Sequence, residues 1–551
     1  MVASDLAGSG WRLPPSSFKD PDEVFVAVTA AEVPNALAAA ESAAMSGRWV
    51  VGMVGYDAGV DGLPLAWFGV YHQPVPLQPR DGDYRLGDLR PAMTRWEHLA
   101  AVGAIKERIA AGDTYQVNLT FPMVTEIDGS AACLFGDMVA AQPRCYGAYL
   151  DLGAVEVLSA SPELFLSRFG EILTSKPMKG TAPRGRFGTE DDQARLGLVE
   201  SEKERAGNVM IVDMVRNDLG RLAETGTVVV PELYAVERHP TVWQMTSTVT
   251  ASMPPEVGLA ALFEACFPCG SVTGAPKQST MSIITAVEAQ LRGVYCGAIG
   301  YLAPGGDFEF NVAIRTATAI GGNLRYGVGG GITFDSDPEA EYRECLWKAR
   351  LLTAPPVTPT LVETMRMEKG EIALIDRHLA RLYDSARYWA IPLDLERVQA
   401  TLQDLDGNWL IRLTVGPAGA MDVERRRLPD PRGTVRLRLA TDPIDSSESH
   451  WFHKTADRSR YPPPVDCDEV VLWNERGEVT ETGLSNIMVR LDGVWTTPPL
   501  DSGCLPGVFR ALLLEKKKVV ERVVTLDEVR TADDLAVTNA VRGWRGALLI
   551  E

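Results

Sequence analysis

The chain has 551 residues, a formal net charge of −19, 46% hydrophobic and 23% charged residues, which is an ordinary globular composition with room for roughly two to four domains. The acidic balance disfavours nucleic acid and anionic membrane surfaces as partners, and no apolar stretch approaches the roughly 18 residues of a membrane span. The start lacks a secretory pattern and the eight cysteines are scattered, so a reducing cytoplasmic setting is expected.

The first 350 or so residues alternate predicted helices and strands. Apolar spacing predicts an amphipathic helix over 94–111, and residues 112–124 alternate like a strand. Residues 154–177 are interpreted as two strands around a turn. Further helices are predicted over 201–219, opened by a capping box of Ser201 and Glu204, over 278–291, and over 335–352 with Pro338 in its first turn.

A break follows in TAPPVTPT at 353–360, which is interpreted as a linker because proline does not continue a helix. After it, 361–367 is predicted to be a strand, 378–390 a helix, 435–441 and 468–474 strands, and 486–498 a hairpin with an Asp-Gly turn. The predicted domains are 1–90, the beginning of a first module, 91–352, its catalytic core, and 361–551, a second module.

Several sequence blocks of the first module resemble the chorismate-utilising family. They occur in the family's order over about 260 residues, and they are GDTYQVNLT, SASPELFLSR, KPMKGTAPRG, IVDMVRNDLGR, FPCGSVTGAPK, YCGAIGY, NVAIRT and GVGGGITFDSDPEAEYRECLWKA. This resemblance implies an α/β (α+β) fold with large, mostly antiparallel sheets flanked by helices. It also implies that chorismate is the substrate.

Three residues of these blocks indicate one branch of the family. Glu163 matches the general acid that helps expel the C4 hydroxyl. Gln116 stands where water-activating members carry a lysine, and glutamine is no base. Lys179 in PMKGT matches the nucleophile that attacks C2 in aminodeoxychorismate synthases before ammonia attacks C4. The alternative is that Glu163 and Lys179 are ordinary surface residues.

The resemblance also predicts how the substrate carboxylates are held. The Gly-rich run GSVTGAPK leads into a helix and is suited to anion binding, with Thr273 as one contact and Arg315 as a charged fork. Tyr295 is expected nearby, and Gly329 and Gly331 are expected to offer backbone amides. The glycines are equally compatible with simple turns.

Magnesium is the metal that the resemblance implies. Glu344 is the predicted direct ligand, Glu341 acts through water, and both lie on one helix face. The family's second metal-binding glutamate is replaced here by Gly207, and Glu204, one turn earlier, is predicted to reach the ion through water. Alternatively, Glu344 forms an ordinary helical ion pair with Lys348.

The second module resembles the class IV pyridoxal-phosphate enzymes, and among them aminodeoxychorismate lyase. The blocks are HLARLYDSA, HKTADR, DEVVLWNERGEVTETGLSNI and TPPLDSGCLPGVFR. The resemblance implies an α+β domain in which Lys454 bonds covalently to the cofactor and moves the α-proton. Glu481 pairs with the pyridine nitrogen, Arg381 meets the phosphate, and the backbone amides of Val508 and Phe509 complete the phosphate site.

Three hypotheses of function remain open from the sequence. In the first, the chain is bifunctional and makes 4-aminobenzoate from chorismate, for folate or a secondary product. In the second, the pyridoxal-phosphate half alone is active, as a lyase or aminotransferase, because Gly207 impairs the metal site. In the third, the chain is a non-enzymatic binding protein. The sequence lacks a glutamine amidotransferase block, so ammonia is expected from a separate glutaminase subunit or from solution.

Overall fold

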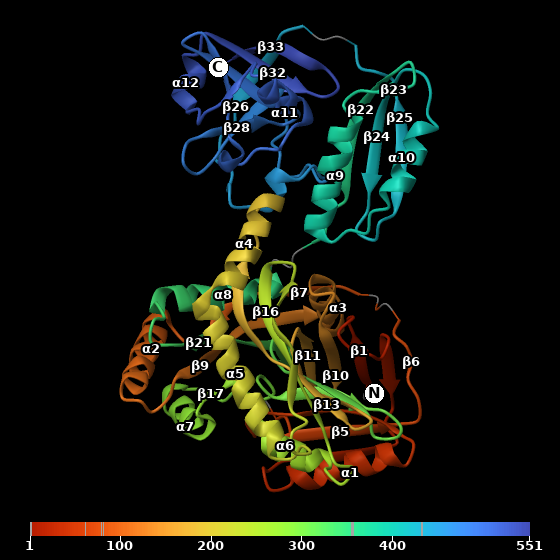
Figure 1. Cartoon of the computed structure of the whole chain (residues 1–551), viewed down its shortest axis with the longest axis vertical. Helices are drawn as coiled ribbons and strands as arrows, with labels where there is room; N and C mark the ends of the chain where they lie inside the picture. Colours follow the sequence, from red (N-terminus) through yellow and green to blue (C-terminus); the bar gives the residue numbers. More distant parts are fainter. Residues whose placement is uncertain are drawn as a thin grey trace. The chain divides into compact units, whose positions relative to one another are not determined.

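The computed structural model describes residues 3–60, 62–78, 80, 82–353, 357–430 and 433–550 (Figure 1). The chain divides into two compact units: residues 1–183 and 195–357 make the first, while 184–194 and 358–551 make the second. A short segment from within the predicted first module is therefore part of the second unit. Of the predicted linker 353–360, Thr353 ends a helix, and residues 354–356 lie outside the described part of the chain.

Two large antiparallel sheets form the first unit. The first sheet contains, in spatial order, β17 (Gly274–Ala275), β9 (Gln116–Gly129), β21 (Asn323–Ile332), β20 (Thr316–Ile320), β11 (Val155–Ser161), β10 (Tyr146–Asp151), β1 (Ala3–Ala7), β2 (Ser16–Lys19) and β6 (Val75–Pro76), with β7 (Tyr84–Leu86) and β8 (Arg90–Pro91) paired to β9. The second contains β14 (Met178–Pro183), β16 (Val242–Ser252), β13 (Ile172–Lys176), β12 (Leu164–Phe169), β19 (Phe308–Val312), β18 (Ala298–Leu302), β4 (Trp49–Val54), β5 (Ala66–Tyr71) and β3 (Glu23–Ala27), with β15 (Val229–Arg238) paired to β16.

Helices cover the outer faces of these sheets. They are α1 (Val33–Met45), α2 (Arg95–Ala110), α3 (Ala131–Ala141), α5 (Glu202–Gly220), α6 (Leu259–Cys266), α7 (Lys277–Val287) and α8 (Pro338–Thr353). Helix α2 begins with a full capping box between Thr94 and Glu97. Helix α5 has half of the predicted box, because Ser201 accepts a hydrogen bond from the Glu204 backbone.

Strand alternation explains how the two sheets pack together. In β4, Val50 and Val54 join the core beneath α1 and α6, whereas Val51 and Met53 join the core between the sheets. Successive strand residues point to opposite faces, so a strand that is apolar throughout is covered on both sides. Leu6 and Leu150 of the first sheet face Met53 in the same inter-sheet cluster. The expected fold of large antiparallel sheets flanked by helices is confirmed.

One sequence-based expectation about strands is wrong. Residues 154–177 form three strands rather than two, β11, β12 and β13, and β11 lies in a different sheet from the other two. The chain changes sheets at Pro162 and Glu163, between β11 and β12. Because proline cannot donate to a strand ladder, this is a natural point for pairing to end. The change of sheet places Glu163 in the interior.

The second unit contains two sheets. The antiparallel small sheet contains β23 (Glu371–Ile372), β22 (Leu361–Glu368), β24 (Trp409–Val415) and β25 (Met421–Arg426), with helices α9 (Ile375–Trp389) and α10 (Leu395–Gln403). The mixed larger sheet contains β28 (Val479–Thr482), β27 (Glu469–Trp473), β26 (Val435–Leu439), β33 (Gly543–Leu549), β32 (Asp534–Asn539), β29 (Asn486–Leu491), β30 (Val494–Thr497) and β31 (Val520–Glu521), with helices α11 (Val508–Glu515) and α12 (Leu526–Arg530). The predicted hairpin is present as β29 and β30, with Asp492 and Gly493 at positive φ.

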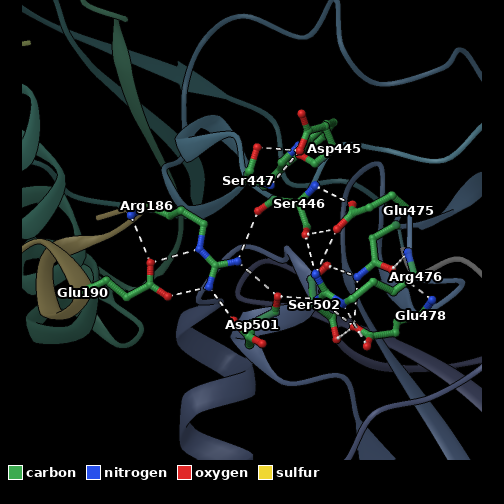
Figure 2. A network of polar contacts seen from close by, with 12 residues as sticks. Arg186, Glu190, Asp445, Ser446, Ser447, Glu475, Arg476, Glu478, Asp501 and Ser502 are labelled. Carbon is green, nitrogen blue, oxygen red and sulfur yellow. Dashed lines mark hydrogen bonds and ion pairs between the residues drawn. The ribbon is translucent and has the colours of Figure 1, made fainter. Parts of the chain in front are cut away.

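The segment 184–194 is held within the second unit by a polar network (Figure 2). It includes the first turns of helix α4 (Gly188–Glu200). Arg186 is bonded to Glu190 of its own segment and also donates to the backbone carbonyls of Ser446 and Asp501, at 3.2 and 3.3 Å. Phe187 packs on Phe452 with ring centroids 5.0 Å apart. These contacts make the segment a structural part of the second unit.

In the described part of the chain, no helix is both long enough and apolar enough to span a membrane.

Candidate active sites

Lys179 and Gln116 meet in the first unit, although they come from different sheets. A Cβ added to Gly331 would lie 2.7 Å from Lys179 Nζ and 2.9 Å from Gln116 Nε2, so both side chains face this glycine. Gly331 pairs with Asn118, two residues beyond Gln116, in the β9–β21 ladder. Both side-chain polar atoms of Gln116 are buried without a hydrogen-bond partner in the described structure. The Lys179 amine and the unpartnered Gln116 amide therefore lie close together beside Gly331.

Charge around Lys179 is mixed. Removal from water lowers the pKa of this amine, and the ammonium of Lys348 lowers it further. The carboxylates of Glu204, Glu341 and Glu344 act in the opposite direction. Because desolvation is the largest influence, the pKa remains below its usual value, which favours the neutral nucleophilic form.

Glu163 is a buried acid beside the Lys179 strand. Its side chain is 2% exposed, and burial raises its pKa to about 7, opposed by a hydrogen bond from Ser271. The backbone N–H of Met178, the residue before Lys179, approaches Glu163 Oε1 at 3.4 Å. A carboxyl group with this pKa is partly protonated near neutral pH. It can therefore donate a proton to a leaving oxygen.

The three predicted magnesium ligands do not form a metal centre by themselves. Within the described residues, no three His, Cys, Asp or Glu side chains are close enough to share an ion. Glu341 accepts a hydrogen bond from Ser336 at 2.7 Å, and Glu344 pairs with Lys348 at 2.7 Å. The glutamates influence Lys179, and one oxygen of Glu341 and one of Glu344 are engaged by other side chains.

Gly207 lies directly over the Lys179 side chain. A Cβ built on Gly207 would meet Cε and Cγ of Lys179, each at 3.6 Å, which is ordinary van der Waals contact. The next residue, Asn208, is buried and donates to the backbone carbonyl of Lys179 at 2.9 Å. Its amide oxygen accepts a hydrogen bond from Ser247 at 2.6 Å. Helix α5 therefore fixes the Lys179 backbone.

The residues predicted to contact the substrate carboxylates each have a different hydrogen-bond partner in the structure. Thr273 is fully buried, and its hydroxyl donates to the Cys269 carbonyl at 3.0 Å. Arg315 has φ of +51° and donates to the Lys348 carbonyl at 2.8 Å. The Gly329 carbonyl accepts a hydrogen bond from Lys348 at 2.7 Å.

The Tyr295 ring is packed over Gly327, where a Cβ would come within 2.2 Å of the ring. Burial raises the pKa of this phenol well above its usual value. The Tyr295 phenol is therefore uncharged at neutral pH where it packs over Gly327. Its hydroxyl has the character of a hydrogen-bond donor rather than a base.

Sequence reasoning gave no role to Ser271 or Asn208, and it considered Lys348 only as the helical partner of Glu344. All three lie within the quoted family blocks or next to a predicted ligand. Asn208 directly follows Gly207, which stands at a predicted ligand position, and Ser271 lies in the Gly-rich run. A weak signal was therefore present, but only the tertiary contacts show which partner each side chain meets.

The second unit has a cavity of about 460 Å³ with Lys454 in its wall. Burial lowers the pKa of Lys454 to about 8, helped by the nearby Arg381 guanidinium. The backbone of this lysine is held at the small sheet, because its carbonyl accepts from the Val362 N–H at 2.9 Å. The cavity therefore presents an amine that is partly neutral near neutral pH.

Glu481 lies in the same cavity, 3% exposed. Burial raises its pKa to about 7, opposed by hydrogen bonds from the Leu505 backbone and the Tyr461 hydroxyl. The Tyr461 hydroxyl is 3.2 Å from Glu481 Oε1, and the Arg458 guanidinium stacks 3.6 Å from the centre of the Tyr461 ring. A buried carboxylate of this kind is suited to a cationic ring N–H. A bound protonated nitrogen would lower its pKa again.

The other predicted cofactor residues line the same cavity. Arg381 is aligned by two charge-assisted hydrogen bonds to Glu363, at 2.8 and 2.6 Å. Val508 and Phe509 are the first residues of α11, where backbone N–H groups have no partner within the helix. His378 also lines the cavity and keeps a buried ring nitrogen without a hydrogen-bond partner.

These groups fit a phosphorylated pyridine. A guanidinium, a helix N-terminus and unsatisfied buried polar atoms suit the phosphate, an acid suits the ring nitrogen, and an amine suits an aldehyde carbon. The hydroxyl of Thr538, two residues before Ala540, is a further unsatisfied polar atom on the cavity wall. The part of the cavity wall from the small sheet and its following loop is basic, with Arg412, Arg426 and Arg427, and favours an anionic substrate.

Comparison with known proteins gives two family matches. The family described as chorismate binding enzymes matches residues 19–354, and the family described as class IV amino-transferases matches residues 463–550. The first unit also resembles the crystal structure of anthranilate synthase component I from Streptococcus pneumoniae TIGR4, with a TM-score of 0.55, 25% identity, and coverage of 64% of this chain and 92% of that one.

Curated relatives match the first unit more closely. An aminodeoxychorismate synthase of Streptomyces griseus is 44% identical over 254 residues, which are 46% of this chain and 35% of the relative. Aminodeoxychorismate synthase component 1 of Escherichia coli K12 is 40% identical over 268 residues, which are 49% of this chain and 59% of the relative. The chain thus spans less than two thirds of each of these relatives.

Removing the buried acid is expected to change stability in a pH-dependent way. The folded pKa of Glu163 is about 7 against an ordinary 4.5, so its burial costs little at low pH and more as pH rises through 7. Glu163→Gln should therefore stabilise the chain by about 2 kcal/mol more at pH 8.5 than at pH 5. Urea unfolding of the first unit at both pH values measures this. Equal effects at both would contradict a raised pKa.

Filling the glycine in α5 is also expected to be favourable. Gly207→Ala should raise the stability of the first unit by about 1 kcal/mol, because glycine in a helix interior costs about that much and the new Cβ fits against Lys179.

Gly207→Glu should increase magnesium affinity, measured by calorimetry, by adding a carboxylate beside the other glutamates. Unchanged affinity would show that this position does not face the ion.

Proposed function

This chain belongs to the family of chorismate binding enzymes, and on that premise we propose that it converts chorismate to 4-aminobenzoate in two steps. The first unit replaces the C4 hydroxyl of chorismate by an amino group. The second unit eliminates pyruvate from the product. Support comes from the aminodeoxychorismate synthase relatives for the first step and from the class IV match for the second.

The observation that carries the first step is the shared position of Lys179 and Gln116 at Gly331. A lysine amine with a lowered pKa is a nucleophile. Glutamine at the neighbouring position cannot take a proton from water, which disfavours a hydroxyl product. The site is therefore suited to covalent capture of the substrate ring rather than to hydration.

The reaction at this unit follows from the two groups. Lys179 Nζ forms a bond to C2 of the ring as the double bond shifts and the C4–O bond breaks. Glu163 gives its proton to the departing oxygen, which leaves as water. Ammonia then bonds to C4, the double bond shifts back, and the C2–N bond to Lys179 breaks. The proton that the Lys179 nitrogen loses when it bonds to C2 returns to it as it leaves, and the proton lost by the ammonia nitrogen returns Glu163 to its acid form.

The substrate carboxylates are proposed to bind cationic, hydroxyl and backbone amide groups near Lys179. Arg315 and the hydroxyl of Thr273 are proposed contacts, with the backbone at Gly329 and Gly331 and the Tyr295 hydroxyl beside them. The family also implies magnesium. Because Glu204, Glu341 and Glu344 do not make a three-ligand site in the described structure, no step is assigned to the ion.

In the second unit, the class IV match implies pyridoxal phosphate. When bound, this cofactor draws electrons away from the substrate α-carbon. Lys454 holds the cofactor and moves the α-proton, Glu481 keeps the pyridine nitrogen protonated, and Arg381 with the amides of Val508 and Phe509 holds the phosphate. The arginines at the small-sheet side of the cavity favour a substrate with two carboxylates.

Elimination is preferred to amino transfer because the first unit is proposed to make the lyase's substrate in the same chain. The family description of the second unit favours amino transfer as the competing activity. The two are separated by supplying aminodeoxychorismate with and without a keto acid. Pyruvate release without a keto acid identifies a lyase.

Ammonia is proposed to come from a separate glutamine amidotransferase subunit, in a cytoplasmic setting. One of the matched relatives is itself called a component 1, which supports a second component. The prediction from this is a simple contrast. The chain alone should use ammonium salts and should not use glutamine.

Loss of the nucleophile tests the first step. Lys179→Met keeps the length of the side chain but has no amine, so formation of aminodeoxychorismate from chorismate and ammonium should fall by at least about 100-fold. Product masses provide the measurement. Lys203→Met, at an exposed position of α5 without a predicted role, is the control. Undiminished product in Lys179→Met would remove the proposal.

Covalent attachment tests the second site. After pyridoxal phosphate is added and the protein is treated with borohydride, mass mapping should find the cofactor on Lys454 and on no other lysine. Lys454→Ala should take up none. Attachment elsewhere, or to Lys454→Ala in equal amount, would contradict the assignment.

A further inference from the structure

The segment 184–194 reaches the residue next to Lys454. Residues 184–194 belong to the second unit, although they follow directly after strand β14, which carries Lys179. The Arg184 side chain of this segment stacks over Tyr388, whose ring packs on His453 with ring centroids 4.4 Å apart. His453 directly precedes Lys454 in the chain. The segment therefore contacts the wall that presents the cofactor lysine.

The segment is internally rigid. Arg184 binds Asp191 through two charge-assisted hydrogen bonds, at 2.6 and 2.7 Å, and both side chains are more than nine-tenths buried. The N–H of Gly185 donates to the same carboxylate at 3.1 Å. A Cβ on Gly185 would come within 2.2 Å of the Asp191 backbone nitrogen, so this turn requires glycine. The turn is a pre-formed element rather than a loose loop.

One side of the turn is fixed to helix α9. Arg184 donates to the Tyr388 carbonyl at 3.0 Å and stacks over the Tyr388 ring at 4.5 Å. The Tyr388 hydroxyl donates back to the Gly185 carbonyl at 2.7 Å. Tyr388 in turn packs on His453, with ring centroids 4.4 Å apart. The turn thus holds the Tyr388 ring in contact with His453, the residue before Lys454.

The other side is fixed to the loops of the larger sheet. Arg186 stacks over the ring of Phe452 at 5.0 Å and binds the backbone of Ser446 and Asp501 (Figure 2). Phe187 packs on the same Phe452 ring. Phe452 and His453 are consecutive, so the segment contacts Phe452 directly and His453 through Tyr388.

The His453 side chain is held in place by burial and by a hydrogen bond. Its ring is 4% exposed, its Nδ1 is 2.9 Å from the Ser385 hydroxyl, and burial lowers its pKa to about 3. At Lys454 the backbone carbonyl accepts from Val362 of β22, and two residues later the Ala456 N–H donates to the carbonyl of Thr360, directly before β22. Lys454 is therefore fixed on one side by β22 and on the other by the segment.

We propose that the segment 184–194 positions Lys454 for the cofactor, with Arg184 and Arg186 as positioning residues that act through Tyr388, Phe452 and His453. The proposal rests on the assignment of pyridoxal phosphate to this cavity. It means that a piece of chain lying between the two halves of the first site is required for the second site. Family resemblance gave this segment no role in the second unit.

The test uses the whole chain and measures cofactor binding. Arg186→Ala and Arg184→Ala should each weaken pyridoxal phosphate binding by about tenfold, equivalent to the loss of one charge-assisted hydrogen bond. They should also shift the pH at which the bound cofactor's absorbance changes, since that transition depends on how Lys454 is held. Arg186→Lys, which keeps the charge, should restore part of the affinity.

Arg387→Ala is the matched control. Arg387 also pairs with the segment, at Asp192, but both side chains are nearly half exposed. An exposed pair contributes little, so affinity should stay within about twofold of the parent. Helix content and the unfolding midpoint, measured on every variant, separate loss of positioning from loss of fold.

Three results would overturn the proposal. Unchanged affinity and pH transition in both Arg184→Ala and Arg186→Ala would show that Lys454 is placed without the segment. An equal loss in Arg387→Ala would show a general effect of loosening. If the parent chain itself takes up no pyridoxal phosphate on Lys454, the proposed function of the second unit fails, and this inference fails with it.

Discussion

Burial of ionisable side chains determines the chemistry available in both units. Glu163 and Glu481 are carboxyl groups whose pKa rises to about 7 because the fold removes them from water, and burial lowers the pKa of Lys454 to about 8. Lys179 is shifted downward for the same reason. Acids that retain a proton and amines that lose one are what proton donation and nucleophilic attack require near neutral pH. The surrounding sheets and helices supply that dry environment.

The position of these groups depends on where strands end and change sheets. Glu163 is buried because the chain leaves one sheet at Ser161 and enters the other at Leu164. Gln116 is at the first residue of β9, opposite the glycine-rich end of β21, where the missing side chains leave room for the lysine. The glycine run, for which the sequence left amide donation and simple turns open, is the end of strand β21.

Local sequence patterns predicted the elements well where the signal is local. The Ser201 cap of α5 and the Asp-Gly hairpin of β29 and β30 depend on neighbours a few residues away; the hairpin is present, and the predicted capping box is half formed. The strands of 154–177 were misjudged, because the sequence does not show which sheet a strand joins. The family blocks indicated one site for Lys179 and Gln116, and both side chains approach Gly331, whereas only the structure shows one oxygen of Glu344 paired with Lys348. The place of 184–194 depends on residues more than 200 positions away and has no local signal.

The three passages of the chain between its units have a consequence for synthesis on the ribosome. Arg186 is made 315 residues before its partner Asp501. At about 5–20 residues per second, this is a delay of roughly 15–60 s. The first unit therefore has time to fold around an eleven-residue insert whose docking surface has not yet been translated. Locking of this insert becomes a late event in maturation, and Lys454 acquires its final surroundings after both sheets of the first unit are complete.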